Sequence, residues 1–291
     1  MNAIEISNLS KTFRGKRFAT VEALKDLTLS VTKGEIFGFL GPNGAGKSTT
    51  IKILMGLISA TSGDVRLLNQ PSSNPVSRKS VGYLPENPAF YDYLTAEEYV
   101  RFVAKSFDVD EKTLQSKCEE VLKLLELWEA RKRPIRTYSK GMVQRVGLAQ
   151  VLVHDPDIYI LDEPMSGLDP IGRALVKKII LDLKVRGKTV FFSTHITSDV
   201  ETVCDRVAII VNGTLQRVDR VETILTEGIV GYMVRLKGRE GTGHREVQVA
   251  KDELSAFMAK AQADGEEIVL IEPNRKNLEE FFLDIVRSKP C

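Results

Sequence analysis

The strongest constraint on this chain is a glycine-rich turn that stands between a strand pattern and a helix pattern. The apolar run EIFGFL (35–40) is typical of a buried strand, and TTIKILMGLI (49–58) has apolar residues at helical spacing. The residues between them fit the pattern G-x-x-x-x-G-K-[ST]: Gly41, Pro42, Asn43, Gly44, Ala45, Gly46, Lys47 and Ser48. Glycines let successive backbone N–H groups face an anion at the positive end of the following helix. The chain is therefore predicted to bind nucleotide phosphates on an α/β fold.

The side chains at the end of this phosphate-binding loop (P-loop) are suited to a nucleotide and its metal. Lys47 is expected to reach the β- and γ-phosphates, and Ser48 to offer its hydroxyl to Mg²⁺. Thr49, the next residue, completes the predicted nucleotide-contacting set. A glycine turn without function would not need this order of strand, turn and helix.

A second strand pattern, IYIL (158–161), ends in two adjacent acids, Asp162 and Glu163. Burying unpaired carboxylates costs several kcal/mol, so two acids at the end of a buried strand indicate a use for them. Asp162 is where a P-loop protein holds Mg²⁺, and Glu163 is placed to polarise an attacking water. A solvated strand end is the alternative. The pair favours hydrolysis of the nucleotide over simple binding.

The rest of the first 219 residues predicts a mixed architecture. Residues 3–9 and 27–31 alternate apolar and polar residues, which indicates an antiparallel β layer joined by a basic loop. Residues 88–155 have helical spacing and form a helical insert. Short apolar runs separated by helical stretches then predict a mostly parallel sheet, with strands at 158–164, 189–194 and 206–211.

The pattern changes beyond Gln216, and we place a domain boundary near Arg220. Residues 1–219 would then be the nucleotide-binding domain and residues 220–291 a small α+β domain. Its expected strands and helices are GYMVRLK, REVQVA, DELSAFMAKAQAD, EEIVLIE and the amphipathic NLEEFFLDIV. The glycine-rich stretch Lys237–Gly243 is interpreted as a hairpin loop.

Composition excludes several classes of protein. The chain has 41 basic and 39 acidic residues, so no nucleic-acid partner is expected. Its longest apolar stretches, such as Val207 to Val211, fall far short of the ~20 residues that cross a bilayer. The first residues lack the apolar segment of a secretory signal. We therefore expect a cytoplasmic chain that is not itself inserted in a membrane. Three scattered cysteines form no C-x-x-C pair and are expected to be reduced: Cys118, Cys204 and Cys291.

The segment Tyr138-Ser139-Lys140-Gly141-Met142 precedes a helix pattern. Alone it is a weak signal, because an ordinary N-cap serine would explain it equally well. Together with the P-loop and the paired acids, however, it resembles the LSGGQ signature of the ATP-binding cassette (ABC) ATPases. The resemblance covers about residues 3–217 and includes further motifs in order. These are Phe13 as the aromatic that stacks on adenine, Ser166-Gly167-Leu168-Asp169 as the D-loop, and His195 as the switch histidine.

The resemblance implies the Mg²⁺-dependent ATPase subunit of an ABC membrane transporter. Each ATP would be held by the P-loop of one copy and covered by Ser139 and Gly141 of a second copy, with Asp169 nearby. Lys47 and His195 would assist Glu163 at the γ-phosphate. The implied partners are the second copy and integral membrane permease subunits, which would hold the chain peripherally on the cytoplasmic side. The closing NLEEFFLDIV resembles the tail of ATPases that pair with separately encoded exporter permeases.

Two positions depart from the family pattern. After VGYLP, where the family commonly has a glutamine that touches Mg²⁺, this chain has Glu86. A carboxylate there can still bind the metal but adds negative charge beside the γ-phosphate. In the signature, Lys140 replaces the first glycine and Met142 the final glutamine. Lys140 either adds an electrostatic contact or points into solvent.

A few other features leave alternatives open. His154 is interpreted as a favourable cation near a helix C-terminus. The aromatics Phe90, Tyr91 and Tyr93 either pack the insert or line the groove where, in similar proteins, the membrane subunit docks a short helix. The main rival function is a soluble cassette ATPase that acts on a ribosome, on DNA or in cluster assembly. A P-loop kinase or GTPase would have no reason for the signature segment, and a catalytically inactive binding module none for the intact acids.

Overall fold

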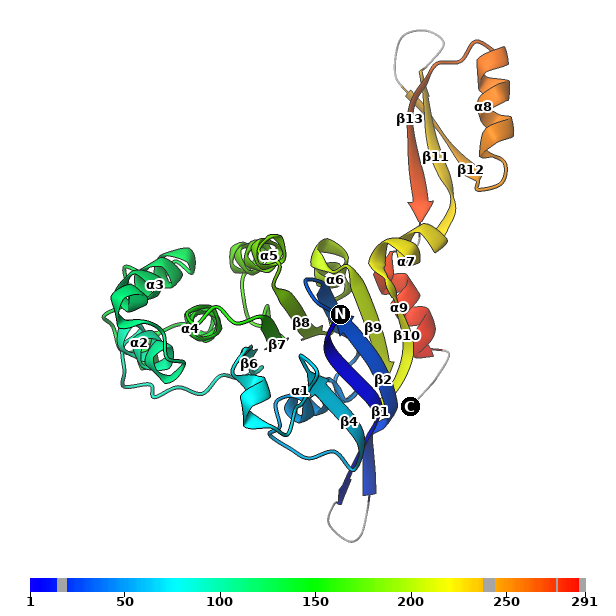
Figure 1. Ribbon diagram of the computed structural model, residues 1–291. Helices are drawn as coiled ribbons and strands as arrows, with labels where there is room; N and C mark the ends of the chain where they lie inside the picture. The colour runs from blue at the N-terminus through cyan, green and yellow to red at the C-terminus, as the bar shows by residue number, and fades with distance from the viewer. Residues whose placement is uncertain (15–19, 238–243, 276, 288–291) are drawn as a thin grey trace. The chain divides into compact units, whose positions relative to one another are not determined.

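The computed structural model describes residues 1–14, 20–237, 244–275 and 277–287 (Figure 1). The chain divides into two compact units, Met1–Val218 and Asp219–Cys291. Within the described ranges, none of the helices has both the length and the apolar content that a bilayer crossing requires. The expected loop at 238–243 and Cys291 lie outside the described residues.

The first unit begins with an antiparallel sheet in the order β2-β1-β4-β5. Its strands are β1 (Asn2–Arg14), β2 (Thr20–Thr32), β4 (Ser62–Leu67) and β5 (Gln70–Pro71). The predicted layer is present, but β1 and β2 are each 13 residues long and occupy much of the expected loop. Irregularities in their pairing, such as the one between Ile6 and Leu9, shift which side chains face the core. The strict alternation that identified residues 3–9 therefore does not mark the full strand.

The second sheet of this unit has the order β10-β9-β3-β8-β7-β6, and its pairs β9–β3–β8–β7–β6 are parallel. Three of its six strands are buried over their full length, as expected for a sheet covered on both faces. The strands are β3 (Ile36–Leu40), β6 (Val81–Leu84), β7 (Ile158–Asp162), β8 (Thr189–Thr194), β9 (Arg206–Val211) and β10 (Thr214–Arg220).

Helices α1 (Lys47–Leu54), α5 (Pro170–Val185) and α6 (Thr197–Val203) pack against this sheet. The helix expected at 49–58 begins two residues earlier and ends earlier, because Gly56 adopts a left-handed φ of 62° that terminates a helix. The order of the helices along the chain is shown by the colours of Figure 1.

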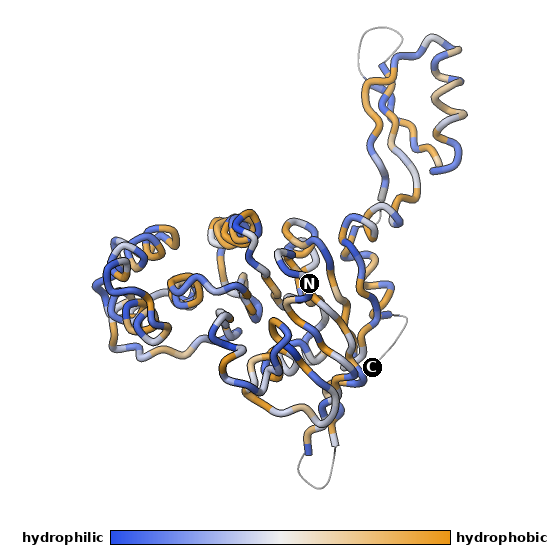
Figure 2. The backbone as a smooth tube through the Cα atoms, in the orientation of Figure 1, coloured by the Kyte–Doolittle hydropathy of each residue, from blue (hydrophilic) through white to orange (hydrophobic). Residues whose placement is uncertain are grey.

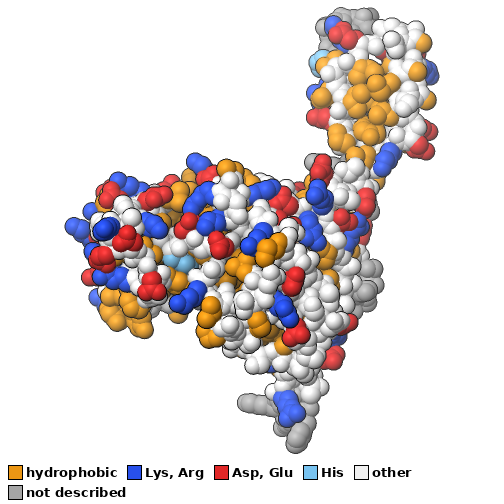
Figure 3. Space-filling model, in the orientation of Figure 1, with side chains coloured by type: hydrophobic (Ala, Val, Ile, Leu, Met, Phe, Trp, Pro, Cys, Tyr) orange, Lys and Arg blue, Asp and Glu red, His pale blue; other side chains and the backbone are white. Residues whose placement is uncertain are grey.

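The insert is helical, as predicted. It contains α2 (Ala96–Ser106), α3 (Glu111–Leu124), the 3₁₀ turn η3 (Ile135–Thr137) and α4 (Lys140–Leu152), and a further turn, η2 (Pro75–Arg78), precedes it. A capping box starts α2, in which Thr95 and Glu98 satisfy each other's backbone N–H groups. Charged side chains of both signs cover the outside of these helices (Figure 3).

The second unit is a small α+β structure. Its sheet has the order β12-β11-β13, formed by β11 (Ile229–Lys237), β12 (His244–Ala250) and β13 (Ile268–Arg275). The helices are α7 (Val221–Glu227), α8 (Leu254–Ala263) and α9 (Leu278–Arg287). A core of Val234, Leu236, Val249 and Ala261 joins α8 to the sheet. Apolar and polar residues intermix along the helices of both units, as in amphipathic helices (Figure 2).

Candidate nucleotide-binding and catalytic site

The P-loop follows β3 and requires glycine for reasons of space and of backbone conformation. A Cβ at Gly41 would lie 2.4 Å from the carbonyl oxygen of Ile210, and one at Gly46 would lie 2.6 Å from that of Ala23. Gly44 and Gly46 also have φ values of 81° and 106°, which other residues rarely adopt. Neighbouring backbone therefore fixes the course of this loop.

The start of α1 faces a pocket of about 270 Å³. The first N–H groups of a helix have no intrahelical acceptor, and Gly46, the N-cap of α1, has no side chain to satisfy them. Such N–H groups are suited to phosphate oxygens. The residues that line the pocket are Ala23, Asn43, Gly44, Gly46, Lys47, Ser48, Thr49, Glu86 and Glu163.

Lys47 is buried, with 6% of its surface exposed, and its ammonium is held inside the loop. It donates to the carbonyl oxygens of Gly41 at 2.8 Å and Pro42 at 3.3 Å. It also lies 3.5 Å from Oε1 of Glu163. A nucleotide that draws Lys47 to its phosphates would exchange neutral acceptors for charged ones, which bind an ammonium more strongly.

Asp162 and Glu163 end β7 and are 2% and 7% exposed. The hydroxyl of Ser193 joins them, since it donates to Oδ1 of Asp162 at 2.5 Å and accepts from the backbone N–H of Glu163 at 3.0 Å. Glu163 has a φ of 50°, a conformation that costs energy in a residue with a side chain and is concentrated at functional sites. Sequence reasoning missed Ser193, although a hydroxyl inside the apolar run FFST was a usable signal.

His195 follows β8 and contacts the same carboxylate. Its Nδ1 lies 3.1 and 3.0 Å from the two carboxylate oxygens of Glu163. Nδ1 is thus placed to donate to this carboxylate, which in its ionised form only accepts hydrogen bonds.

Four neighbouring parallel strands bring these groups together. Leu40 pairs with Thr194, Asp162 with Ser193, and Leu84 with Leu161, so β3, β8, β7 and β6 end at the same edge of the sheet. The P-loop, His195, the two acids and Glu86 follow these ends in that order. Ligands of open α/β sheets bind beyond the carboxyl ends of the strands.

The donors of this edge fit Mg²⁺ that arrives with a nucleotide. Among the described residues, no group of three or more His, Cys, Asp or Glu side chains forms a metal cage. Mg²⁺ commonly needs only one or two carboxylates beside the phosphates of its substrate. Asp162 and Glu86 are carboxylates and Ser48 a hydroxyl, all hard oxygen donors, and Ser48 and Glu86 line the phosphate pocket.

Phe13 lies on the long ribbon of β1 and β2, where it pairs with Val21, two residues before the pocket-lining Ala23. Its side chain is 40% exposed. The ammonium of Lys11 lies 4.9 Å from the centre of its ring. Phe13 does not line the phosphate pocket, but it pairs with β2, the strand that contributes Ala23 to that pocket.

The signature segment lies at the start of α4, outside the phosphate pocket of the same chain. Ser139 is the N-cap, and its Oγ accepts from the N–H of Met142 at 3.3 Å. Asp169 caps α5 in the same manner, accepting from Gly172 at 2.7 Å. Gln144 ties α4 to the loop after Glu163, donating to the carbonyl oxygen of Pro164 at 3.2 Å. The structure thus separates Ser139, Gly141 and Asp169 from the P-loop group.

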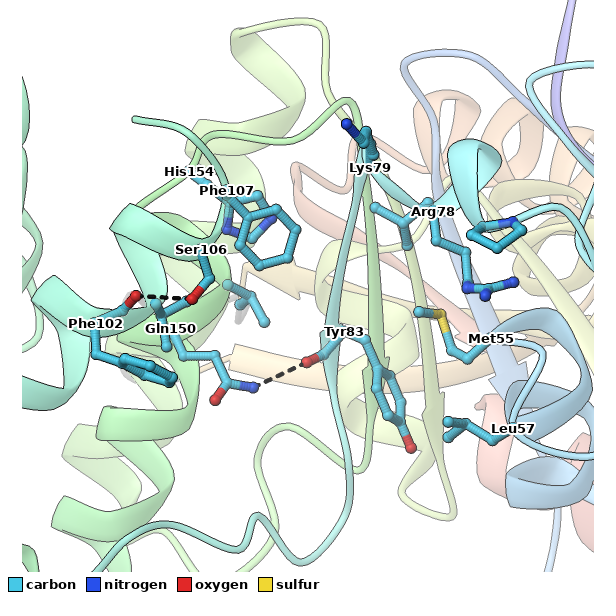
Figure 4. A pocket seen from close by; sticks show the side chains of 14 residues that line it. Met55, Leu57, Arg78, Lys79, Tyr83, Phe102, Ser106, Phe107, Gln150 and His154 are labelled. Atoms are coloured by element: carbon cyan, nitrogen blue, oxygen red, sulfur yellow. Dashed lines mark hydrogen bonds between the residues drawn. The ribbon is translucent and has the colours of Figure 1, made fainter. Parts of the chain in front are cut away.

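A second pocket, of about 510 Å³, lies between the sheet and the insert (Figure 4). It is walled by Met55, Leu57, Pro75, Arg78, Lys79, Val81, Tyr83, Phe102, Val103, Ser106, Phe107, Gln150, Val151 and His154. We refer to this pocket as the insert groove. Tyr91 packs against Phe102 beside it, whereas Phe90 packs edge-on against the buried Tyr99. Phe90 therefore belongs to the core of the insert, and Tyr91 borders the groove.

The expectation that His154 is a cation is wrong. Its ring stacks on Phe107, with centroids 3.8 Å apart. Burial lowers the pKa of His154, so the ring is neutral at pH 7. Burial also raises the pKa of Tyr83, to about 12. The insert groove is therefore walled by neutral and apolar groups apart from Arg78 and Lys79.

The chain is similar to known proteins over nearly its whole length. A family model described as ABC transporter matches residues 24–166. An uncharacterized ABC transporter ATP-binding protein of Synechocystis is 41% identical, over 99% of this chain and 86% of the relative. The bacitracin transport ATP-binding protein BcrA of Bacillus licheniformis is 39% identical, over 69% of this chain and 65% of its own. A dimeric ATP-binding cassette solved in a post-hydrolysis state with ADP and Pi has a TM-score of 0.69 and 25% identity, covering 75% of this chain and 98% of that one. These similarities confirm the predicted fold class.

Proposed function

Because the chain belongs to the ABC transporter family as an ATP-binding subunit, we propose that two copies share two ATP sites and drive a membrane permease by closing on ATP and reopening after hydrolysis. One observation carries this proposal. Lys47, Glu163 and His195 converge on one edge of the sheet, while the signature residues Ser139 and Gly141 of the same chain lie outside that pocket. A second copy would supply the missing face.

The residues at the sheet edge can perform hydrolysis. The P-loop N–H groups and Lys47 bind the phosphates, and Glu163 takes a proton from a water that attacks the γ-phosphorus. The bond from that phosphorus to the β–γ bridging oxygen breaks, which gives ADP and inorganic phosphate. When bound, Mg²⁺ would offset negative charge on the phosphates, held by Ser48, Asp162 and Glu86. The contact with His195 orients the carboxylate of Glu163.

Pairing of two copies completes the site. The N-terminus of α4 in the partner, with Ser139 and Gly141, would cover the γ-phosphate and exclude water from one side. Stacking on Phe13 would hold adenine, and Asp169 would lie near the seam. Dimeric cassettes among the similar solved structures support this arrangement.

The insert groove is proposed as the seat of a cytoplasmic helix of the permease. It is largely apolar, and Leu57, Phe102 and Phe107 on its wall are 60%, 53% and 40% exposed. Tyr91 and Tyr93 extend this apolar surface. A partner helix that buries such side chains would hold the chain peripherally at the cytoplasmic side of a membrane. The groove also contacts β6, whose end carries Glu86, so it can relay movement to the ATP site.

Export is the direction we propose. The closing NLEEFFLDIV, which includes α9, resembles the tail of exporter ATPases, and the similarity to a bacitracin transport protein supports a transport role. The alternative, a soluble cassette ATPase, would leave the insert groove without a membrane partner.

A reconstitution experiment tests the proposal. Tagged full-length chain would be purified from detergent-solubilised membranes, its integral membrane partner identified by mass spectrometry, and the complex rebuilt in lipid vesicles. We expect the partner to stimulate ATP hydrolysis and Phe102→Arg to release it. Val185→Arg, at an 87% exposed position on α5, is the matched control and should leave the complex intact. Recovery of only soluble partners, with ATPase activity indifferent to membrane protein, would favour the alternative.

A further inference from the structure

The phosphate pocket carries an excess of negative charge. Among the described residues that line it, Lys47 is the one cation, while Glu86 and Glu163 are acids. Lys47 already lies 3.5 Å from Glu163. Glu86 is exposed and has no hydrogen bond or ion pair with any described residue. A triphosphate entering this pocket therefore meets an uncompensated carboxylate, and the repulsion between them rises as closure removes water.

The insert contains a segment with an excess of positive charge. Residues 130–154 contain no Asp or Glu and six cations: Arg131, Lys132, Arg133, Arg136, Lys140 and Arg145. Two of these pair with acids outside the segment, Arg131 with Glu97 and Arg145 with Glu126. Within the described part of the chain, Lys132, Arg136 and Lys140 form no ion pair.

Of these three cations, Lys140 lies within the signature segment, because it is the first residue of α4, between Ser139 and Gly141. A cation at the positive end of a helix is unfavourable unless an anion is near, and the first turn of α4 contains no acid. The stem of Lys140 is laid across Gly167. A Cβ on Gly167 would lie 2.6 Å from Cε and 3.1 Å from Nζ of Lys140. The stem of the lysine thus lies along the D-loop, and the residue as a whole stays exposed.

We propose that Lys140 of one subunit supplies the positive charge that balances Glu86 of the other subunit when the two close on ATP. The two departures from the family pattern are then a compensating pair, one on each side of the shared site. This inference rests on the proposed shared-site function. It predicts that Lys140 contributes to closure through its charge, and only while Glu86 is a carboxylate.

A double-mutant cycle on the ATP-bound dimer tests the pairing. All variants carry Glu163→Gln to slow hydrolysis, and the dimer dissociation constant is measured by analytical ultracentrifugation with saturating ATP and Mg²⁺. Lys140→Gln keeps most of the stem and removes the charge, and Lys140→Arg restores the charge. Lys132→Gln is the matched control, since Lys132 is also an exposed lysine of this basic segment without an ion pair.

The expected result is that Lys140→Gln weakens the dimer about 10-fold, close to the lower end of the range for charge pairs across an interface. Lys140→Arg restores the parent value, and Lys132→Gln changes it less than about 2-fold, as expected for an isolated surface charge. In the Glu86→Gln background, Lys140→Gln should also cost less than about 2-fold. Raising the salt concentration should shrink the difference between the two backgrounds.

Two results would overturn the inference. The first is an equal loss from Lys140→Gln in both backgrounds, which would make its effect independent of Glu86. The second is a loss of nucleotide affinity in the monomer, which would place Lys140 in its own subunit's site. If the Glu163→Gln parent itself does not dimerise with ATP, the shared-site function fails instead, so the two failures are distinguishable.

Discussion

The carboxyl edge of the parallel sheet and the start of α4 differ in whether their polar side chains are paired and buried within one chain. At the sheet edge, Lys47, Asp162 and Glu163 are buried and bonded to one another or to nearby backbone and hydroxyl groups. At the start of α4, Ser139 and Lys140 are exposed. Polar groups are buried only when they are paired, so the first region is a completed structure. The second region is exposed in the single chain, and we propose that a second copy covers it.

The glycines of the two regions show the same difference. Gly41 and Gly46 face backbone carbonyls at distances that no side chain could tolerate, so the P-loop is fixed by its own subunit. Gly141 has room, because a Cβ there would meet only a side-chain carbon of Leu168 at 3.5 Å. Its small size is thus not required by the fold of its own chain, which is consistent with a requirement set across a subunit interface.

The largest expected effect is a loss of turnover after substitution at the carboxyl edge of the sheet. Glu163→Gln should lower the turnover of Mg-ATP by about 10²–10⁴-fold, the usual contribution of a general base, and leave ATP binding intact. Steady-state phosphate release and equilibrium nucleotide binding measure the two quantities. The exposed Glu120→Gln on α3 is the control and should be inert. Full turnover in Glu163→Gln would remove Glu163 as the base and make Glu86 the candidate.

Glycine substitutions in the two regions should change the free energy of unfolding by different amounts. Gly41→Ala should lower the free energy of unfolding by about 2 kcal/mol or more, because its Cβ collides with the Ile210 carbonyl. Gly141→Ala should leave stability unchanged or slightly raise it, since alanine is the better helix former by up to about 1 kcal/mol. Urea unfolding followed by the single tryptophan, Trp128, reports on this unit. Equal destabilisation by both substitutions would show that the start of α4 is as constrained as the P-loop.

The smallest expected effect is at Glu86. Glu86→Gln should keep turnover or raise it by up to about 5-fold, since an exposed charge interaction is worth up to about 1 kcal/mol. Because we propose that this carboxylate adds negative charge beside a bound Mg²⁺, the dependence of turnover on Mg²⁺ concentration should become less steep in Glu86→Gln. Turnover titrated with Mg²⁺ measures both quantities. A collapse to the level of Glu163→Gln would instead give Glu86 an indispensable role of its own.

The parts of this molecule that local sequence determines were predictable. The P-loop is one such part, because its glycines, its lysine and its helix are contiguous in the chain. The strand that ends in Asp162 is another, because a short apolar run predicts a buried strand and the two acids that follow it predict a functional role. The order of strands that assembles the site was not predicted, because it depends on how distant segments of the chain pair in the sheet.

Features set by contacts between distant segments were not predictable. The contact between His195 and Glu163 depends on the register of β7 and β8, and so does the bridging hydroxyl of Ser193. His154 was assigned a charge from its place near a helix end, but its ring stacks on Phe107, on another part of the insert, and burial lowers its pKa. The strands β4, β5 and β10 and the helix α7 were missed because they are short or lack a clear apolar pattern.

The mass of the Glu163→Gln protein with trapped ATP tests most directly whether a second copy binds at the exposed start of α4. Light scattering of the 32.4 kDa chain should show a doubled mass with ATP and Mg²⁺ and a monomer with ADP. Adding Ser139→Arg should keep the particle monomeric with ATP, because its bulk lies at the seam. A parent protein that stays monomeric with ATP, or a Ser139→Arg protein that doubles as its parent does, would contradict the shared site.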